Sequence, residues 1–426
     1  MTLAEAAEAI RNGRLRPSRL AAECLQRIER TDTRWRAWAR VDRAGALRDA
    51  ALLDRELDAG SARGPLHGIP IGVKDIIDVA GLPTRAGSPL RESHLAAEDA
   101  AIVSQLRAAG AVVLGKTVTT QFACFDPPET VNPHDASRTP GGSSSGSAVA
   151  VATQTCLAAL GSQTGGSIIR PASYCGIVGF KPSKDRWSTS GVVPVSGHLD
   201  HVGPLTACVA DLLPIWKAVV GSPVTGPPTV PSASRPQRFG LVRGLFQSAA
   251  DPRAWAHVNA AAERLIGAED TLESVDPPAE LDEVLAMHRR IMAKDLSDYH
   301  AGSFARCPDQ YAPGIATLIR EGLGISPADY QAALRHRIEF IDVMERAFQH
   351  GPEFWITPAT PSPAPGRETT GDPAFNTPWS YCGFPTVSIP CGNLDGLPVS
   401  LQLIAAGGRD EALLRVAAGL ETKLER

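Results

Sequence analysis

The apolar and polar positions of the chain predict an alternation of helices and strands. In the first sixty residues apolar side chains recur at helical spacing, and Thr2 and Ser18 stand where the caps of two amphipathic helices belong. The short apolar run 71–74, which ends in a lysine, predicts a buried strand. A helix capped by Asp99 then leads to a second strand-like run at 111–114. This alternation is typical of an α/β fold.

The second half of the chain repeats the pattern after a break in composition. The segment between the two halves is rich in Pro and Ser and poor in apolar side chains, which predicts a surface connection. No internal repeat divides the sequence. The parts that we expect are N-terminal helices at 1–60, a core at 61–221, the connection at 222–237 and a C-terminal part at 238–426, with strands near 238–242 and 399–404 and helices near 43–58, 252–268, 279–299, 327–348 and 410–424.

Composition excludes several classes of function. The chain has 426 residues, of which 43% are hydrophobic and 21% charged, so it can bury a large core and is neither disordered nor a coiled coil. A net charge of −4 without a basic run argues against nucleic acid as a partner. Eight cysteines without a C-x-x-C pair predict free thiols rather than a metal site. Because no secretory leader or membrane-length apolar stretch is present, we expect a cytoplasmic protein without membrane contact that acts on a small molecule.

Two runs of glycine and serine carry the candidate chemistry. Residues 141–147 read GGSSSGS and residues 161–171 read GSQTGGSIIRP, and each run leads into sequence that can form a helix. Glycines before a helix let the backbone turn tightly and direct N–H groups at an anion. In acyl transfer that anion is the tetrahedral oxyanion. The segment 163–167 can therefore supply both a nucleophile, Ser167, and its oxyanion hole.

Three other motifs fit the sequence less well. A phosphate-binding loop needs a lysine followed by Ser or Thr after its glycines, and neither run has one. Residues 142–146 match the G-x-S-x-G nucleophile elbow, which would make Ser144 the nucleophile, but that elbow follows a strand and 132–140 has the composition of a loop. The Ser-x-x-Lys pair of penicillin-binding enzymes does not occur in the chain.

The glycine and serine runs resemble the amidase signature, the block that defines a large family of amide hydrolases. The chain has GGSSSGSA at 141–148, GSQTGGSIIRPA at 161–172 and CGIVGFKP at 175–182, with the upstream motif GIPIGVKD at 68–75. The two key serines are 24 residues apart, as in the family. Within it, the chain is most similar to malonamidase-like and urethanase-like amidases, because it shares their departures from the usual signature, which are Ser145, Gln163 and the order Ile169-Arg170.

The resemblance implies a fold, a mechanism and a set of site residues. It implies a single α/β domain over 1–426, with a mixed, twisted central sheet covered by helices on both faces. It implies Ser167 as the nucleophile, Ser143 after a cis peptide bond as the proton relay and Lys74 as the base, without metal or organic cofactor. Lys74 must start neutral, so its pKa must fall from about 10.4 to near 7. This costs ~4 kcal/mol, which burial in an apolar strand can supply. The backbone of Thr164, Gly165, Gly166 and Ser167 would form the oxyanion hole.

Substrate, partners and the other polar residues follow from the same resemblance. We expect a hydrolase of small amides or carbamates, with esterase side activity, that is compatible with a homodimer. Arg170 either holds a substrate carboxylate, as in malonamidase, or forms a structural ion pair. Gln163 and Thr360, the latter in a loop at 355–361, are further candidates for substrate contact. Lys116, Lys181 and all ten histidines are then non-catalytic. The alternatives are a glutaminase-like subunit of a tRNA-dependent amidotransferase and a binding module without activity, which would be expected to have lost a triad residue.

Overall fold

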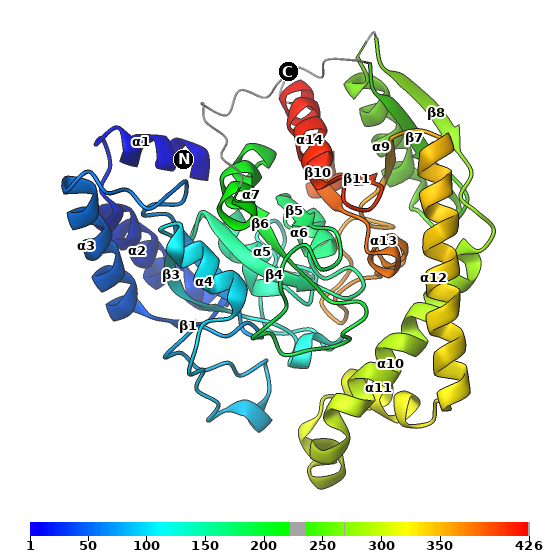
Figure 1. Ribbon diagram of the computed structural model, residues 1–426, viewed down its shortest axis with the longest axis horizontal. Helices are drawn as coiled ribbons and strands as arrows, with labels where there is room; N and C mark the ends of the chain where they lie inside the picture. The colour runs from blue at the N-terminus through cyan, green and yellow to red at the C-terminus, as the bar shows by residue number, and fades with distance from the viewer. Residues whose placement is uncertain (222–235, 268, 425–426) are drawn as a thin grey trace.

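A mixed sheet of eleven strands forms the centre of the structure, a computed structural model that describes residues 1–221, 236–267 and 269–424 (Figure 1). Parallel and antiparallel pairs both occur in the sheet, which confirms the predicted α/β fold. Across the sheet the order is β1 (Trp38–Val41), β3 (Val112–Thr117), β2 (Pro70–Lys74), β4 (Ala158–Gln163), β6 (His201–Thr206), β5 (Val178–Lys181), β10 (Thr386–Leu394), β11 (Leu397–Ala405), β9 (Phe354–Pro358), β7 (Arg238–Val242) and β8 (Thr271–Val275).

The described residues also form α-helices along the whole chain, and short 3₁₀ turns at 89–91, 121–123, 209–211 and 308–310. No helix among them is long and apolar enough to cross a membrane. In chain order the helices are α1 (Leu3–Arg11), α2 (Pro17–Trp35), α3 (Arg43–Asp58), α4 (Ala101–Ala108), α5 (Ser145–Ala152), α6 (Ile169–Tyr174), α7 (Leu212–Val220), α8 (Leu245–Ser248), α9 (Pro252–Leu265), α10 (Leu281–Arg306), α11 (Pro313–Leu323), α12 (Pro327–His350), α13 (Thr377–Cys382) and α14 (Asp410–Leu424).

Helices cover both faces of the sheet, as the resemblance implied. Successive side chains of a strand point to opposite faces, and β3 shows the result. Val112 and Leu114 lie in a core with α2, α3, α5 and α6, whereas Val113 lies in a core with α1, α4, α7, α9 and α14. A third core joins α10, α12 and α13 to β7 and β9. Because its strands are buried on both faces, much of the sheet reads as continuous apolar runs rather than as an alternation.

The predicted helix starts are confirmed in one case and wrong in two. Thr2 and Glu5 form a capping box at α1, with Glu5 N donating to Thr2 Oγ1 at 3.1 Å. Ser18 is not a cap, because α2 begins one residue earlier at Pro17, whose ring favours the first helical position. Asp99 is not a cap either, because its carboxylate accepts the backbone N–H of Ala80 at 2.7 Å, and α4 begins only at Ala101.

Two parallel strands bring the signature motifs of the sequence to one edge of the sheet. β2 and β4 are neighbours in parallel register, with Val73 beside Leu160. Lys74 is the last residue of β2, and Gln163 is the last residue of β4. The carboxyl ends of parallel strands meet at the same edge, so the lysine and the second glycine run lie together although they are far apart in sequence.

The two halves of the chain share this one sheet. β10, from the C-terminal half, pairs antiparallel with β5 of the signature core, with Thr386 beside Lys181. Figure 1 shows α10, α11 and α12 at the opposite end of the molecule from α1, α2 and α3. The predicted connection falls mainly on 222–235, which lies outside the described residues.

Candidate active site

A cavity of about 240 Å³ lies beside the loop that follows β4. Ser143 and Ser167 both line it, so the structure brings together the two serines of the predicted triad. Segments from both halves of the chain complete its wall. The lining residues are Ala123, Cys124, Phe125, Ser143, Thr164, Gly165, Gly166, Ser167, Arg170, Val195, Leu285, His288, Arg289, Met292, Thr370, Gly371, Asp372, Pro373, Ala374 and Thr377.

Lys74 lies buried behind the cavity, with no exposed surface. Its Nζ is 2.7 Å from Ser143 Oγ, 2.8 Å from Ser162 Oγ and 3.4 Å from the Ser162 carbonyl oxygen. Burial lowers the pKa of Lys74 to about 7, because the charged ammonium loses its hydration, while the charge of Asp200 acts in the opposite direction. A neutral amine there can donate to Ser162 and accept the hydroxyl proton of Ser143.

The backbone at Ser143 has the predicted conformation. The Gly142–Ser143 peptide bond is cis. The neighbouring Ser144 donates its backbone N–H to the Ser167 carbonyl oxygen at 3.3 Å, so the two glycine runs lie side by side. Ser144 stands at the N-cap position of α5 but makes no side-chain cap there, and Ser145 Oγ donates to Gly141 O at 2.6 Å.

The nucleophile-elbow alternative is contradicted. Ser144 is fully buried, does not line the cavity and donates its hydroxyl to the Ser162 carbonyl at 3.2 Å. The residues before it form no strand. An elbow presents its serine at the tip of a strand-to-helix turn, and this serine instead fastens α5 to the end of β4.

The carbonyl groups of the loop 163–167 are all held by hydrogen bonds. These bonds come from five different segments of the chain, so they fix the direction in which each peptide group points. The partners are His201 Nδ1 with Gln163 O at 3.3 Å, His288 Nε2 with Thr164 O at 2.9 Å, Ser380 Oγ with Gly165 O at 2.6 Å, Arg170 N with Gly166 O at 2.9 Å and Ser144 N with Ser167 O at 3.3 Å.

The N–H groups of the same loop differ from its carbonyl groups in their hydrogen bonding. Among the described residues, the N–H groups of Thr164, Gly165, Gly166 and Ser167 have no hydrogen-bond acceptor. All four residues line the cavity. Fixed donors without partners beside a serine hydroxyl are what a developing oxyanion requires, and they cost no reorganisation when the charge forms.

Gln163 and Thr360, two of the predicted substrate contacts, do not line the cavity. Gln163 Oε1 accepts the N–H groups of Ile168 and Ile169 at 2.8 and 3.0 Å, and thereby holds the start of α6. Thr360 is buried after β9, and its hydroxyl donates to the Ser362 carbonyl at 2.9 Å. The structure therefore corrects both predictions of substrate contact, because the Gln163 side chain binds the backbone of α6 and the Thr360 hydroxyl binds the loop that follows β9.

Arg170 lines the cavity and carries an incompletely paired charge. Its Nη2 donates to Gly142 O at 2.8 Å and contacts Thr370 Oγ1 at 3.4 Å, while Nε and Nη1 are buried without partners. Burial lowers the pKa of Arg170, and Tyr174 and Asp372 oppose this effect. No ion pair joins Arg170 to a carboxylate within the described ranges, so the predicted structural ion pair is wrong, although the guanidinium does brace the backbone before Ser143.

The other polar candidates lie away from the reacting groups. Lys116 forms a buried ion pair with Asp75 at 3.0 Å, and Lys181 donates to the Phe384 carbonyl at 2.5 Å. Neither lysine lines the cavity. His288 does line it, but burial lowers its pKa to about 4, so the ring is neutral near pH 7 and its Nε2–H donates to Thr164 O. Within the described ranges no three His, Cys, Asp or Glu side chains are grouped as metal ligands would be.

Sequence reasoning missed Ser162 and three residues of α10 that contribute to the site. Ser162, the second hydroxyl partner of Lys74, lies inside the signature at the end of β4, and the motif itself could have pointed to it. Leu285, His288 and Met292 line the cavity from one face of α10, at intervals of three and four residues. No local pattern distinguishes that face from the rest of an amphipathic helix.

Comparison with known proteins places the chain among amide hydrolases. The family model described as Amidase matches residues 19–414. A glutamyl-tRNA(Gln) amidotransferase subunit from Koribacter versatilis is 33% identical, with 95% of this chain and 94% of the relative covered. A second similarity is to one chain of a solved structure, "An unexpected vestigial protein complex reveals the evolutionary origins of an s-triazine catabolic enzyme". The two chains are 31% identical and superimpose with a TM-score of 0.92, covering 99% of this chain and 98% of the other. Peptide amidase from Stenotrophomonas maltophilia has a TM-score of 0.84 at 26% identity, covering 100% and 97%.

Proposed function

The chain belongs to the amidase family of C–N bond hydrolases, and on this premise we propose that it is a serine hydrolase of small amides or carbamates that forms an acyl-enzyme on Ser167. One observation carries this proposal. Lys74, whose pKa burial lowers to about 7, is linked at 2.7 Å to Ser143 at the wall of a cavity where Ser167 lies among unpaired N–H groups. The hydrogen bond between Lys74 and Ser143, beside Ser167 in the same cavity, also argues against a binding module without activity.

Acylation uses these groups in a fixed order. Ser167 Oγ attacks the substrate carbonyl carbon and passes its proton to Ser143, whose own proton moves to the neutral Nζ of Lys74. The carbonyl oxygen becomes an oxyanion and is held by the free N–H groups of 164–167. The protonated Lys74 then returns a proton through Ser143 to the leaving nitrogen, the C–N bond breaks and the amine departs.

Deacylation repeats the same steps with water. A water molecule gives a proton through Ser143 to Lys74 and attacks the acyl carbon of the ester on Ser167. When the tetrahedral intermediate collapses, Lys74 returns that proton through Ser143 to Ser167 Oγ. The products are the free acid and the regenerated serine, so a carbamate would release its alcohol, carbon dioxide and amine by the same route.

The environment of Arg170 favours a substrate with a carboxylate close to the scissile amide, as the malonamidase-like motif implies. A buried guanidinium with two unpartnered nitrogens gains most from an anion in the cavity, because burying a cation without a counter-charge is costly. Arg289, the second arginine of the wall, is already paired with both oxygens of Glu321 at 2.8 and 2.9 Å.

Active-site labelling tests the proposed function. A fluorophosphonate or sulfonyl fluoride probe should modify Ser167, and peptide mass mapping should locate the adduct there. Ser167→Ala should abolish both labelling and hydrolysis of a panel containing malonamate, a neutral amide, a peptide amide and a carbamate. Labelling at another serine, or full hydrolysis by Ser167→Ala, would refute the acyl-enzyme on Ser167.

A role in an amidotransferase complex is the second candidate, and the Koribacter relative is the observation that favours it. The same Ser167 chemistry would then release ammonia from glutamine for a partner protein. Ammonia release from glutamine at a kcat/KM well above that for malonamate would favour this candidate. We expect the reverse order for the isolated chain, because the resemblance to malonamidase covers the residues around the nucleophile.

A further inference from the structure

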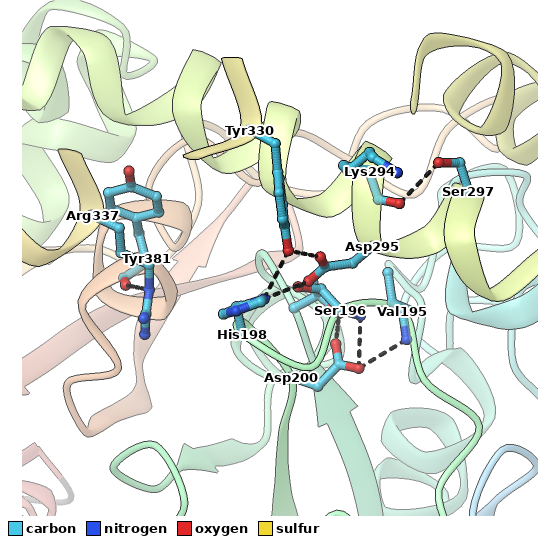
Figure 2. A network of polar contacts seen from close by, with 11 residues as sticks. Val195, Ser196, His198, Asp200, Lys294, Asp295, Ser297, Tyr330, Arg337 and Tyr381 are labelled. Atoms are coloured by element: carbon cyan, nitrogen blue, oxygen red, sulfur yellow. Dashed lines mark hydrogen bonds and ion pairs between the residues drawn. The ribbon is translucent and has the colours of Figure 1, made fainter. Parts of the chain in front are cut away.

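A chain of hydrogen bonds connects the loop 163–167 to the helices α10 and α12. It begins at Thr164, whose Oγ1 donates to Asp200 Oδ1 at 2.6 Å. The second oxygen of Asp200 accepts the backbone N–H groups of Val195 and Ser196 at 2.8 and 3.0 Å (Figure 2). Asp200 therefore ties the segment 195–200 to the residue that opens the proposed oxyanion hole.

The same segment is fastened to the helices through Asp295 of α10. Ser196 Oγ donates to Asp295 Oδ2 at 2.5 Å, and His198 Nδ1 lies 3.0 Å from the same oxygen. The hydroxyl of Tyr330, near the start of α12, donates to Asp295 Oδ1. Figure 2 shows these side chains converging on Asp295 from two separate segments, the loop 195–200 and α12.

α10 also holds Thr164 directly. His288 lies seven residues before Asp295, which places both on one face of the helix. Its Nε2–H donates to the Thr164 carbonyl at 2.9 Å. The helix thus fixes Thr164 at two points: it binds the carbonyl through His288 and orients the hydroxyl through Asp295, Ser196 and Asp200.

We propose that Asp295 is a positioning residue that keeps the N–H groups of the loop 163–167 directed into the cavity. The inference rests on the proposed function. An oxyanion hole works because its donors are oriented before the charge forms, so freedom at Thr164 would weaken binding of the tetrahedral intermediate more than binding of the substrate. The side chain of Asp295 makes no hydrogen bond to a residue that lines the cavity, and it acts on Thr164 only through Ser196 and Asp200.

The surroundings of Asp295 differ from those of an ordinary surface carboxylate. Its side chain is 12% exposed, and its contacts come from residues that are 35 or more positions away in sequence. Asp298, on the same helix, is 59% exposed and pairs only with Lys294 one turn earlier. Asp298→Ala is therefore a matched control that removes the same charge from the same helix without touching the segment 195–200.

The test compares Asp295→Ala with Asp298→Ala in the full-length enzyme. We expect Asp295→Ala to lower kcat about tenfold with KM nearly unchanged, and to weaken binding of a boronic acid or trifluoromethyl ketone that mimics the tetrahedral intermediate by a similar factor. The effect should be smaller than the ~10²–10³ fold lost when an oxyanion donor is removed, since the donors remain. Asp298→Ala should match wild type. Asp295→Asn should recover most of kcat, because its amide oxygen can accept from one of the two hydroxyls of Tyr330 and Ser196 while its NH2 group donates to the other.

Two results would overturn the inference. One is a wild-type kcat in Asp295→Ala, and the other is an equal loss for the ground-state substrate and the tetrahedral mimic. If Asp295→Ala does not fold, Tyr330→Phe and Ser196→Ala replace it, and unchanged kcat in both overturns the inference as well. Failure of wild type to be labelled at Ser167 would instead refute the proposed function, so the two failures are distinguishable.

Discussion

At the scale of single residues, Lys74 is fully buried and its Nζ contacts two hydroxyl groups, those of Ser143 and Ser162. This environment should set the pH dependence of activity. With its pKa near 7, we expect kcat/KM to fall as the pH decreases below about 7, because the protonated amine cannot accept the proton of Ser143. Lys74→Met should lose about 10²–10⁴ fold in kcat/KM.

A matched variant separates this role from general effects of a buried cation. Burial lowers the pKa of Lys181 to about 7 as well, but Lys181 binds a carbonyl away from the cavity. Lys181→Met should therefore keep the acid limb of the pH profile. If the fall of kcat/KM at low pH disappears in Lys181→Met but persists in the residual activity of Lys74→Met, a group other than Lys74 is the base.

The burial of Lys74 also lowers the free energy of unfolding at pH values where the unfolded chain carries its charge. Its folded-state pKa of about 7 lies below the unfolded value of 10.5, so the folded protein binds fewer protons between these pH values and its stability rises with pH across that window. Lys74→Met should be more stable than wild type at pH 7, by an amount on the order of 4 kcal/mol at most, offset in part by the unpaired hydroxyls that remain. Urea unfolding at pH 7 and 9.5 checks this, and a gain that does not shrink at the higher pH would contradict it.

Arg170 should determine whether an acidic substrate is accepted. Arg170→Met is expected to reduce kcat/KM for malonamate by about 10²–10³ fold, the range set by losing a charge-assisted hydrogen bond of roughly 3–4 kcal/mol, while a neutral amide and a carbamate change little. Arg289→Met, at the same wall, should leave the preference intact because Glu321 already pairs with that arginine. Equal losses on all three substrates with a lower melting temperature would make Arg170 purely structural.

At the scale of elements, α10 supplies one wall of the cavity, and its apolar members should limit substrate size. Leu285→Trp narrows a cavity of about 240 Å³ from the α10 side. In Leu285→Trp, kcat/KM for amides with bulky groups should fall about tenfold relative to kcat/KM for the smallest amides. A difference of one methylene in a hydrophobic pocket already changes kcat/KM by ~10–200 fold. Leu323→Trp, on the exposed side of α11, is the control. The same size selectivity in both variants would exclude a specific role for α10.

At the scale of the whole molecule, the cavity depends on both halves of the chain. β10 pairs with β5, and segments 285–292 and 370–377 complete the cavity wall. A fragment of residues 1–221 would expose the edge of β5 and the apolar surface that the C-terminal helices cover, so we expect it to lack a cooperative unfolding transition. Circular dichroism during heating measures this against the full chain. A cooperative transition in the fragment would indicate two domains rather than one.

The sequence by itself determined the local elements and the chemistry of the signature. The capping box at Thr2, the buried strand that ends in Lys74 and the glycine runs around Ser143 and Ser167 could all be read from short patterns. These features depend on contacts between neighbours in the chain, or on a motif whose spacing is fixed, and so they leave a local mark.

Only the tertiary structure decided which side chains surround that chemistry. Lys74 meets Ser162 across 88 residues, Thr164 meets His288 across 124, and Gln163 points toward α6 instead of the cavity. Strand order and the packing of α10 bring these groups together, and both follow from the burial of the whole chain rather than from any short segment. A side chain's local sequence gives its chemical type, but its partners are set by the sheet register and the helix faces that pack against it. For this reason the motif could point to Lys74, Ser143 and Ser167 as candidates, but not to the side chains that surround them.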